Sequence, residues 1–180
     1  ICVVMATRIL WDKGVGEFVE AARSLKLAVP EVRFILVGEP DLDNPASVPK
    51  TTLKAWQEDN VVEWWGHSDA MAKIFQMAHV VCLPSYREGL PKVLIEAAAC
   101  GKPIVTTDVP GCREVVRDGD NGLLVPVRDS KALASALLRL IENSELRTEM
   151  GKRSREIALA EFSSEHIIAQ TLDIYKELVE

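Results

Sequence analysis

The sequence predicts an α/β fold in which helices flank a parallel sheet, and a helical tail follows at the C-terminal end. Three observations lead to this prediction. Short apolar runs alternate with segments of helical periodicity as far as Asp120, which is typical of βαβ units. The runs are apolar along most of their length, as expected for parallel strands that are buried on both faces. Beyond Asp120 the alternation gives way mainly to helical segments.

The expected elements follow one another in a regular order. The expected strands are residues 2–6, 34–37, 61–65, 80–83 and 104–106. The expected helices are residues 16–28, 53–58, 69–76, 91–100 and 113–117. Because parallel strands run in the same direction, the loops that follow them gather at one edge of the sheet, where ligands bind.

The last third of the chain is expected to be mainly helical. Residues 121–127 are interpreted as a turn and one more short strand. A helix capped by Asp129 or Ser130 should run to about residue 143, and two more should cover residues 145–160 and 164–179. Residues 39–50 contain three prolines and are expected to form a long loop.

The composition limits the class of protein. With 180 residues and 48% hydrophobic content, the chain is long enough for one compact domain with a real core. Lys and Arg total 21 against 27 Asp and Glu, a formal charge of −6. A phosphate backbone requires a basic surface, so the charge argues against nucleic acid as a general partner. The longest apolar runs are strand-sized, so no transmembrane helix is expected.

The four cysteines indicate a cellular compartment. Cys2, Cys82, Cys100 and Cys112 form no C-x-x-C pair, and no histidine lies beside them at the spacing of a metal site. We therefore expect free thiols, no metal site and a cytoplasmic location. A secreted protein with two disulfides is the alternative.

Two glutamates eight residues apart are the most informative motif. Glu88 lies on the loop after the fourth strand, and Glu96 lies one to two turns into the next helix. Between them, Gly89 permits a turn closed to bulkier residues, and Pro91 suits the first helical position. The N–H groups at the helix start suit a phosphate and the carboxylates suit hydroxyl groups, so the motif fits a nucleotide-sugar. The alternative is an ion pair between Glu96 and Lys92, which is worth at most a few tenths of a kcal/mol.

The loop after the first strand carries Arg8 and Lys13 just before a helix. Two cations and a helix N-terminus suit a diphosphate. The alternative is a solvated loop with two ordinary surface charges. Gly14 and Gly16 make a poor dinucleotide fingerprint, because Val19 occupies the place of the third glycine.

Two other segments leave alternatives open. Trp64 or Trp65 could form a wall of a base pocket, but neighbouring strand residues point to opposite faces, so at least one belongs to the core. Pro110 and Gly111 form a turn that either lines a donor pocket or simply connects a strand to a helix. Paired glutamates are also typical of glycoside hydrolases, but such an enzyme has no need of a phosphate-binding loop.

Together these residues resemble the C-terminal, nucleotide-sugar-binding domain of the GT4 family of retaining glycosyltransferases. Thr7, Arg8 and Ile9 with Lys13 and Gly14 resemble the family's Gly-Arg-Leu and Lys-Gly segments, with Thr7 in place of the glycine. Residues 84–97 resemble its E-x7-E signature, and residues 101–105 and 119–125 continue the match. The resemblance implies one Rossmann-like domain over residues 1–180, which is one half of a GT-B fold. The N-terminal acceptor domain would lie outside this chain, and the last helices would pack back toward it.

The resemblance also implies roles for particular residues. Arg8 and Lys13 would bind the donor diphosphate and stabilise its charge as it leaves. Glu88 would hydrogen-bond hydroxyl groups of the donor sugar, and Glu96 those of the ribose. The backbone of Gly89 and Leu90 would approach the sugar or phosphate. The strand end near Trp65 would contact the base.

The implied activity is transfer of a hexosyl or N-acetylhexosaminyl group from a UDP-sugar, with retention, to a glycan or lipid-linked acceptor. Such a reaction belongs to bacterial polysaccharide, O-antigen and lipopolysaccharide synthesis, and needs no metal or other cofactor. Any attachment to the inner face of the membrane would lie in the missing domain. The alternatives are a non-catalytic module that binds a nucleotide or glycan, and a nucleotide-sugar epimerase of the same fold.

Overall fold

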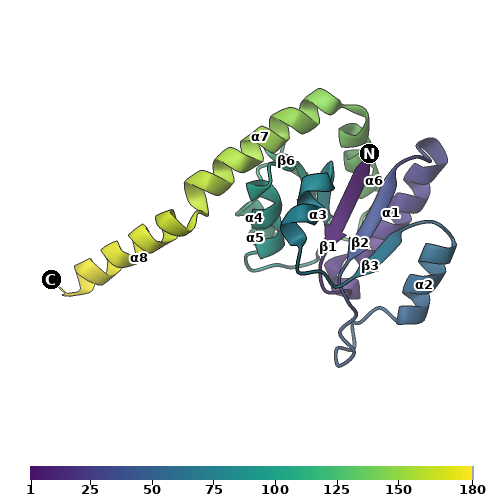
Figure 1. The fold of residues 1–180 in the computed structure, drawn as a ribbon, viewed down its shortest axis with the longest axis horizontal. Coiled ribbons are helices and arrows are strands. Elements are labelled where there is room, and N and C mark those ends of the chain that lie inside the picture. The colour runs from purple at the N-terminus through teal and green to yellow at the C-terminus, as the bar shows by residue number, and fades with distance from the viewer. Residues whose placement is uncertain (180) are drawn as a thin grey trace.

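A computed structural model describes residues 1–179 and shows a six-stranded parallel sheet with helices on both faces (Figure 1). The strands are β1 (Cys2–Ala6), β2 (Arg33–Val37), β3 (Glu63–Gly66), β4 (Val80–Leu83), β5 (Ile104–Thr107) and β6 (Gly122–Val125). The helices are η1 (Trp11–Lys13), α1 (Val15–Ala28), α2 (Lys50–Glu58), α3 (Met71–Met77), α4 (Lys92–Ala99), α5 (Pro110–Arg113), α6 (Ser130–Glu142), α7 (Ser144–Glu161) and α8 (Ser164–Val179). The predicted fold class is confirmed.

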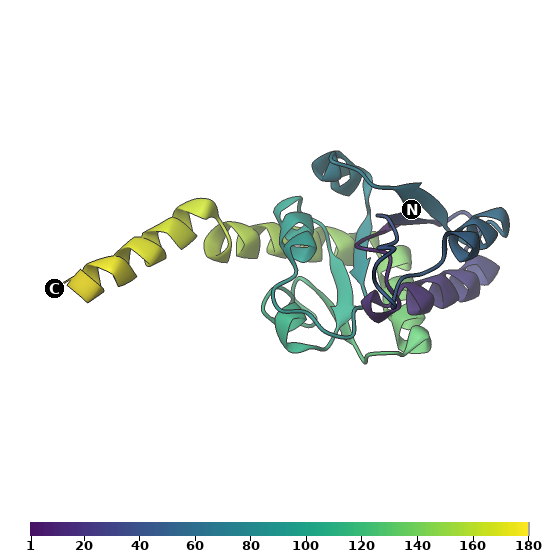
Figure 2. The ribbon, with the colours of Figure 1, turned by 90° about the horizontal axis from the view of Figure 1, so that it is seen from below.

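The order of the strands creates a crevice in the middle of the sheet. The order is β3-β2-β1-β4-β5-β6, so the chain runs outward from β1 in one direction and then outward from β4 in the other. The loops after β1 and β4 therefore leave in opposite directions, which is the arrangement that opens a ligand site in doubly wound folds. Helices α1 and α6 pack together on one face, and α4 packs with α7 on the other (Figures 1 and 2).

The core explains why the strands read as unbroken apolar runs. All residues of β1 and β4 are buried, because helices cover both faces of these central strands. The core continues into apolar faces of the helices, with Phe18 of α1 packed edge-on against Phe34 of β2 at 5.9 Å between ring centroids. Within residues 1–179, no helix combines the length and apolar character needed to span a bilayer.

The predicted position of α5 was wrong. A helix over residues 113–117 was expected, but the helix is Pro110–Arg113 and the chain then turns. The buried side chain of Asn121 explains the early end. Its amide oxygen accepts the N–H of Arg117 at 2.7 Å, and its amide nitrogen donates to the carbonyl of Val115 at 3.0 Å. The Asn121 oxygen thus takes the N–H of Arg117, which a continuing helix would bond to the carbonyl of Arg113, and local periodicity cannot reveal this.

The other elements lie close to their predicted bounds. Strand β3 starts at Glu63 rather than residue 61, and α2 starts at Lys50 rather than residue 53. The short helix η1 was not predicted. Helix α6 is capped by Asp129, whose carboxylate accepts the N–H groups of Lys131 and Ala132 at 3.1 and 2.8 Å.

Helix α8 differs from the rest of the chain in its surroundings. It continues from α7 and extends away from the sheet (Figure 1, yellow). Large apolar side chains along it are exposed, namely Ile167, Ile168, Leu172, Ile174, Tyr175 and Leu178. A helix that is amphipathic by sequence therefore lies largely outside the core.

His79 links β4 to the start of β1. Its Nδ1 accepts the backbone N–H of Cys2 at 3.2 Å, which requires the nitrogen to be unprotonated. Burial lowers the pKa of His79 below its ordinary value of about 6.5. The neutral ring is therefore part of the folded state.

We expect acidification to destabilise the chain in part through His79. The folded-state pKa is the lower one, so the unfolded chain binds the proton more readily. The contribution of neutral His79 to the free energy of unfolding is present above the unfolded-state pKa of about 6.5. It is lost as the pH falls through the folded-state pKa. His79→Asn retains an acceptor but does not titrate. In urea denaturation at pH 7 and 5, the variant should lose less free energy of unfolding than the wild type. Equal losses would contradict this assignment.

Candidate functional site

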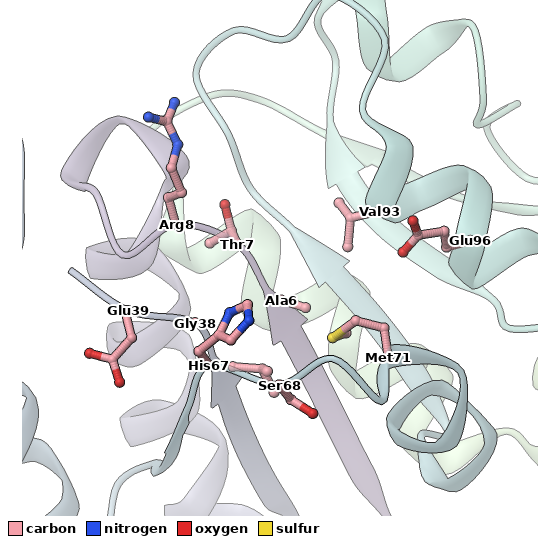
Figure 3. Close-up of a pocket in the computed structure, with 11 residues that line it drawn as sticks. Ala6, Thr7, Arg8, Gly38, Glu39, His67, Ser68, Met71, Val93 and Glu96 are labelled. Atoms are coloured by element: carbon pink, nitrogen blue, oxygen red, sulfur yellow. The ribbon is translucent and has the colours of Figure 1, made fainter. Parts of the chain in front are cut away.

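A cavity of about 370 Å³ lies at the carboxyl ends of the central strands. Its walls come from the loops after β1, β2 and β3 and from helices α3 and α4 (Figure 3). The lining residues are Ala6, Thr7, Arg8, Val37, Gly38, Glu39, His67, Ser68, Met71, Val93 and Glu96. The cavity therefore occupies the crevice that the strand order opens.

Glu96 and Arg8 lie on different sides of this cavity. Glu96 is in the second turn of α4 beside Val93, whereas Arg8 follows β1 (Figure 3). Within the described part of the chain, no ion pair joins Glu96 to Lys92, so the purely structural alternative for this glutamate is not realised. The carboxylate is left available to a ligand.

Arg8 is held by an acidic neighbour at the rim. Its guanidinium donates to Asp41 at 3.1 Å, and the Arg8 side chain is 64% exposed. In Figure 3 it points away from the floor of the cavity. An anion that binds in the cavity would therefore compete with Asp41 for the guanidinium.

Lys13 and Glu88 form an ion pair between the loops after β1 and β4. Lys13 Nζ lies 2.7 Å from Glu88 Oε1, and the two side chains are only 18% and 12% exposed. The structure therefore brings these two predicted residues together. Arg8 and Lys13, however, pair with different carboxylates, and of the two only Arg8 lines the cavity.

Two glycines allow the loops to approach this closely. Gly14 has φ +76°, and a Cβ there would overlap the carbonyl of Pro84, at the start of the loop that carries Glu88. Gly38 has φ +132°, and a Cβ there would overlap the carbonyl of Thr7. Both positions combine a left-handed backbone with a close contact, so only glycine fits without a shift.

Gly89 differs from its predicted role. It was expected to make a turn closed to bulkier residues, but its φ is not in the left-handed region, and a Cβ would meet nothing within 4 Å. Only the side of Gly89 on which a Cβ would stand is therefore open. The next residue, Leu90, is 51% exposed. Pro91 is the N-cap of α4 rather than its first residue, so the free N–H groups at this helix start begin at Lys92.

The segment with Pro110 and Gly111 supports the Glu88 loop and does not line the cavity. A Cβ on Gly111 would overlap the carbonyl oxygens of both Glu88 and Gly89. Helix α5 therefore presses directly against the backbone of this loop. Of the two interpretations of this segment, neither anticipated such a support.

The structure does not bring Trp65 to the cavity. Its indole N–H donates to Glu63 at 3.2 Å, and the Arg33 guanidinium lies 5.9 Å from the ring centroid. Trp64 is the half-buried member of the pair and donates to the carbonyl of Gly38 at 2.8 Å. The cavity wall at this end is formed by His67 and Ser68.

The lining residues that the motifs missed follow from strand positions alone. Glu39, His67 and Ser68 lie on loops after strands, where sites are expected, but no motif marks them. Met71 and Val93 are ordinary apolar helix residues. No group of three His, Cys, Asp or Glu side chains suitable for a metal occurs among residues 1–179. The arrangement can bind an anion and hydroxyl groups through Arg8, Glu96 and a helix start.

Comparisons with known proteins identify the family of the chain. The sequence model described as "Glycosyl transferases group 1" matches residues 1–157. An N,N'-diacetylbacillosaminyl-diphospho-undecaprenol alpha-1,3-N-acetylgalactosaminyltransferase of Campylobacter jejuni is 35% identical over 178 residues, which are 98% of this chain and 45% of that protein. The chain therefore spans about half the length of the relatives it matches.

Solved structures match the fold over the same extent. Sucrose-phosphate synthase from Thermosynechococcus elongatus has a TM-score of 0.84 and 30% identity, over 98% of this chain and 45% of that one. Anabaena Alr3699/HepE, crystallised with UDP and glucose, has a TM-score of 0.82 and 26% identity, over 96% of this chain and 48% of that one. Both resemblances extend over nearly the whole chain.

Proposed function

Because the chain belongs to the glycosyl transferases group 1 family, a GT4-type family with the GT-B fold, we propose that it is the donor-binding domain of a retaining glycosyltransferase. It would transfer a hexosyl or N-acetylhexosaminyl group from a UDP-sugar to a glycan or lipid-linked acceptor. The observation that carries the proposal is the cavity at the carboxyl ends of β1 and β2, with Arg8 at its rim and Glu96 on its α4 wall.

Each part of the donor has a complementary group near this cavity. Arg8 and Lys13 would contact the diphosphate, and the N–H groups at the start of α4 would add partial positive charge. Glu96 would accept ribose hydroxyls and Glu88 those of the sugar. Binding would require Arg8 to leave Asp41 and Lys13 to share its charge with Glu88. Fixed positive groups would then stabilise the diphosphate as it leaves, without a metal.

A second domain would hold the acceptor. This proposal is supported by the share of the relatives that the chain spans, and by the apolar face of α8, which the described residues leave uncovered. The Campylobacter relative is named for an acceptor linked to diphospho-undecaprenol. We extend this to a glycan or lipid-linked acceptor, in polysaccharide synthesis at the cytoplasmic face of a membrane. The chain alone would bind the donor and transfer no sugar.

We expect the chain to bind UDP in a manner that depends on Arg8 and Lys13. In titration calorimetry, Arg8→Ala and Lys13→Ala should each weaken UDP binding by about tenfold to a hundredfold, because each removes a charge-assisted hydrogen bond. Uridine should bind wild type and variants alike, since it lacks the diphosphate. Lys54→Ala, at an exposed position on α2, is the matched control. Absence of binding by both UDP and GDP at millimolar concentration would overturn the proposed site.

A further inference from the structure

Tyr86 lies two residues before Glu88 and reaches across to the first turn of α1. Its hydroxyl donates to Glu17 Oε1 at 2.7 Å. Its backbone N–H donates to the carbonyl of Asp12 at 2.9 Å. One residue of the β4 loop is therefore bonded at two points to the segment that carries Lys13.

The ring of Tyr86 is fixed as well as its hydroxyl. The Arg128 guanidinium lies 4.7 Å from the ring centroid, within the range of a cation–π contact. Burial, together with the bond to Glu17, raises the pKa of Tyr86 to about 12. The phenol therefore stays protonated and continues to donate throughout the neutral range.

Glu17 is not explained by folding alone. Its second oxygen, Oε2, is buried and has no hydrogen-bond partner among the described residues. A buried oxygen without a partner costs free energy, so an apolar side chain would serve packing better at this position. The carboxylate stands where it accepts the hydrogen bond from the hydroxyl of Tyr86. This points to the precise placement of Tyr86 as its purpose.

We infer that Tyr86 and Glu17 are positioning residues that hold the backbone of the β4 loop so that Glu88 is directed at the donor sugar. The inference rests on the proposed function. Arg8 and Glu96 line the cavity, whereas Tyr86 does not, and neither of them takes part in the hydrogen bond between Tyr86 and Glu17. Lys13 remains tethered through the backbone bond of Asp12 to Tyr86, which does not depend on the hydroxyl. The hydrogen bond between Tyr86 and Glu17 should therefore affect the affinity for the sugar part of the donor and not the affinity for UDP.

The test is the ratio of two affinities measured on the same protein. UDP and the three probes UDP-glucose, UDP-N-acetylglucosamine and UDP-N-acetylgalactosamine are titrated into the wild-type chain, and the tightest sugar probe is kept. Tyr86→Phe should reduce the advantage of that probe over UDP by about threefold to tenfold, the value of one hydrogen bond. Glu17→Gln retains an acceptor for the Tyr86 hydroxyl and should keep most of the advantage of the sugar probe over UDP, whereas Glu17→Leu should behave like Tyr86→Phe.

The chain offers a matched control, since it contains only two tyrosines. Tyr175→Phe makes the same chemical change on the exposed part of α8 and should leave both affinities unchanged. Equal weakening of UDP and the sugar probe in Tyr86→Phe would indicate a structural role only and overturn the inference. An unchanged ratio, or a wild type in which the sugar adds nothing to UDP, would also overturn it. A wild type that binds none of the four ligands would instead overturn the proposed function.

Discussion

Replacing Gly14 with alanine is expected to lower the free energy of unfolding by about 2–5 kcal/mol. Two costs combine at this position. The backbone has φ +76°, which disfavours any residue with a Cβ by about 1–2 kcal/mol. The added Cβ would also overlap the carbonyl of Pro84, a backbone atom that cannot move without displacing the loop that carries Glu88. Urea denaturation of the variant measures the sum of the conformational cost and the cost of the overlap.

Gly119 separates the two costs. It has nearly the same φ, +77°, but a Cβ there would meet nothing within 4 Å. Gly119→Ala should therefore show only the conformational cost of about 1–2 kcal/mol. If Gly14→Ala were no more destabilising than Gly119→Ala, the close contact between the β1 and β4 loops would not constrain the fold. Since that contact also sets Lys13 beside Glu88, the Gly14 variant should lose UDP affinity as well.

Replacing Glu96 with alanine is expected to weaken UDP binding by about tenfold to a hundredfold, because hydrogen bonds to a charged acceptor contribute about 1.5–3 kcal/mol. The proposed partners of its carboxylate are the ribose hydroxyls. The sharper experiment therefore compares UDP with 2′,3′-dideoxyuridine diphosphate in calorimetry. The wild type should prefer UDP by the same factor that the variant loses, and Glu96→Ala should bind both ligands equally.

Comparing two proteins with two ligands separates a contact with the ribose from a general effect of charge. Removing any carboxylate near a diphosphate site could strengthen binding, since it removes electrostatic repulsion. Glu142→Ala, at the exposed end of α6, controls for net charge alone. A Glu96 variant that still preferred UDP over the dideoxy ligand would show that this carboxylate does not bind the ribose.

The fold was predictable because its strongest signals are local. Central strands buried on both faces leave unbroken apolar runs, and each lies within two residues of its predicted bounds. Asp129 was recognised as one of two candidate caps because an N-cap bond spans only two or three residues. Helix α5 was misplaced because the Asn121 bonds that end it come from beyond the segment. Side-chain bonds that come from outside a segment leave no periodic trace within it.

The site was predictable where a motif coincides with a strand end. Arg8 was found in this way, and Glu96 through a motif that starts at a strand end and continues into α4; both line the cavity. Their detailed surroundings were not predictable, because Asp41 reaches Arg8 across 33 residues and Glu88 reaches Lys13 across 75. Trp65 was placed near the base because aromatic residues suit bases. Its partner Glu63 lies on the same strand, and its contact with Arg33 depends on the pairing of β3 with β2.

The pairing of β1 with β4 has a consequence for how the molecule comes apart. The β1–β2 ladder has five registered residue pairs, but the β1–β4 ladder has only Val3 with Val80 and Val4 with Val81. The sheet thus consists of two halves that are each contiguous in sequence, β1–β3 and β4–β6, and the strand ladder between them is short, although α1 and α6 also pack across the junction. A nucleotide that contacted Arg8 in the first half and Glu96 in the second would connect the two halves. Occupancy of the site would then suppress sub-global opening between the two halves. The protein without nucleotide would therefore open more readily than the protein with nucleotide bound.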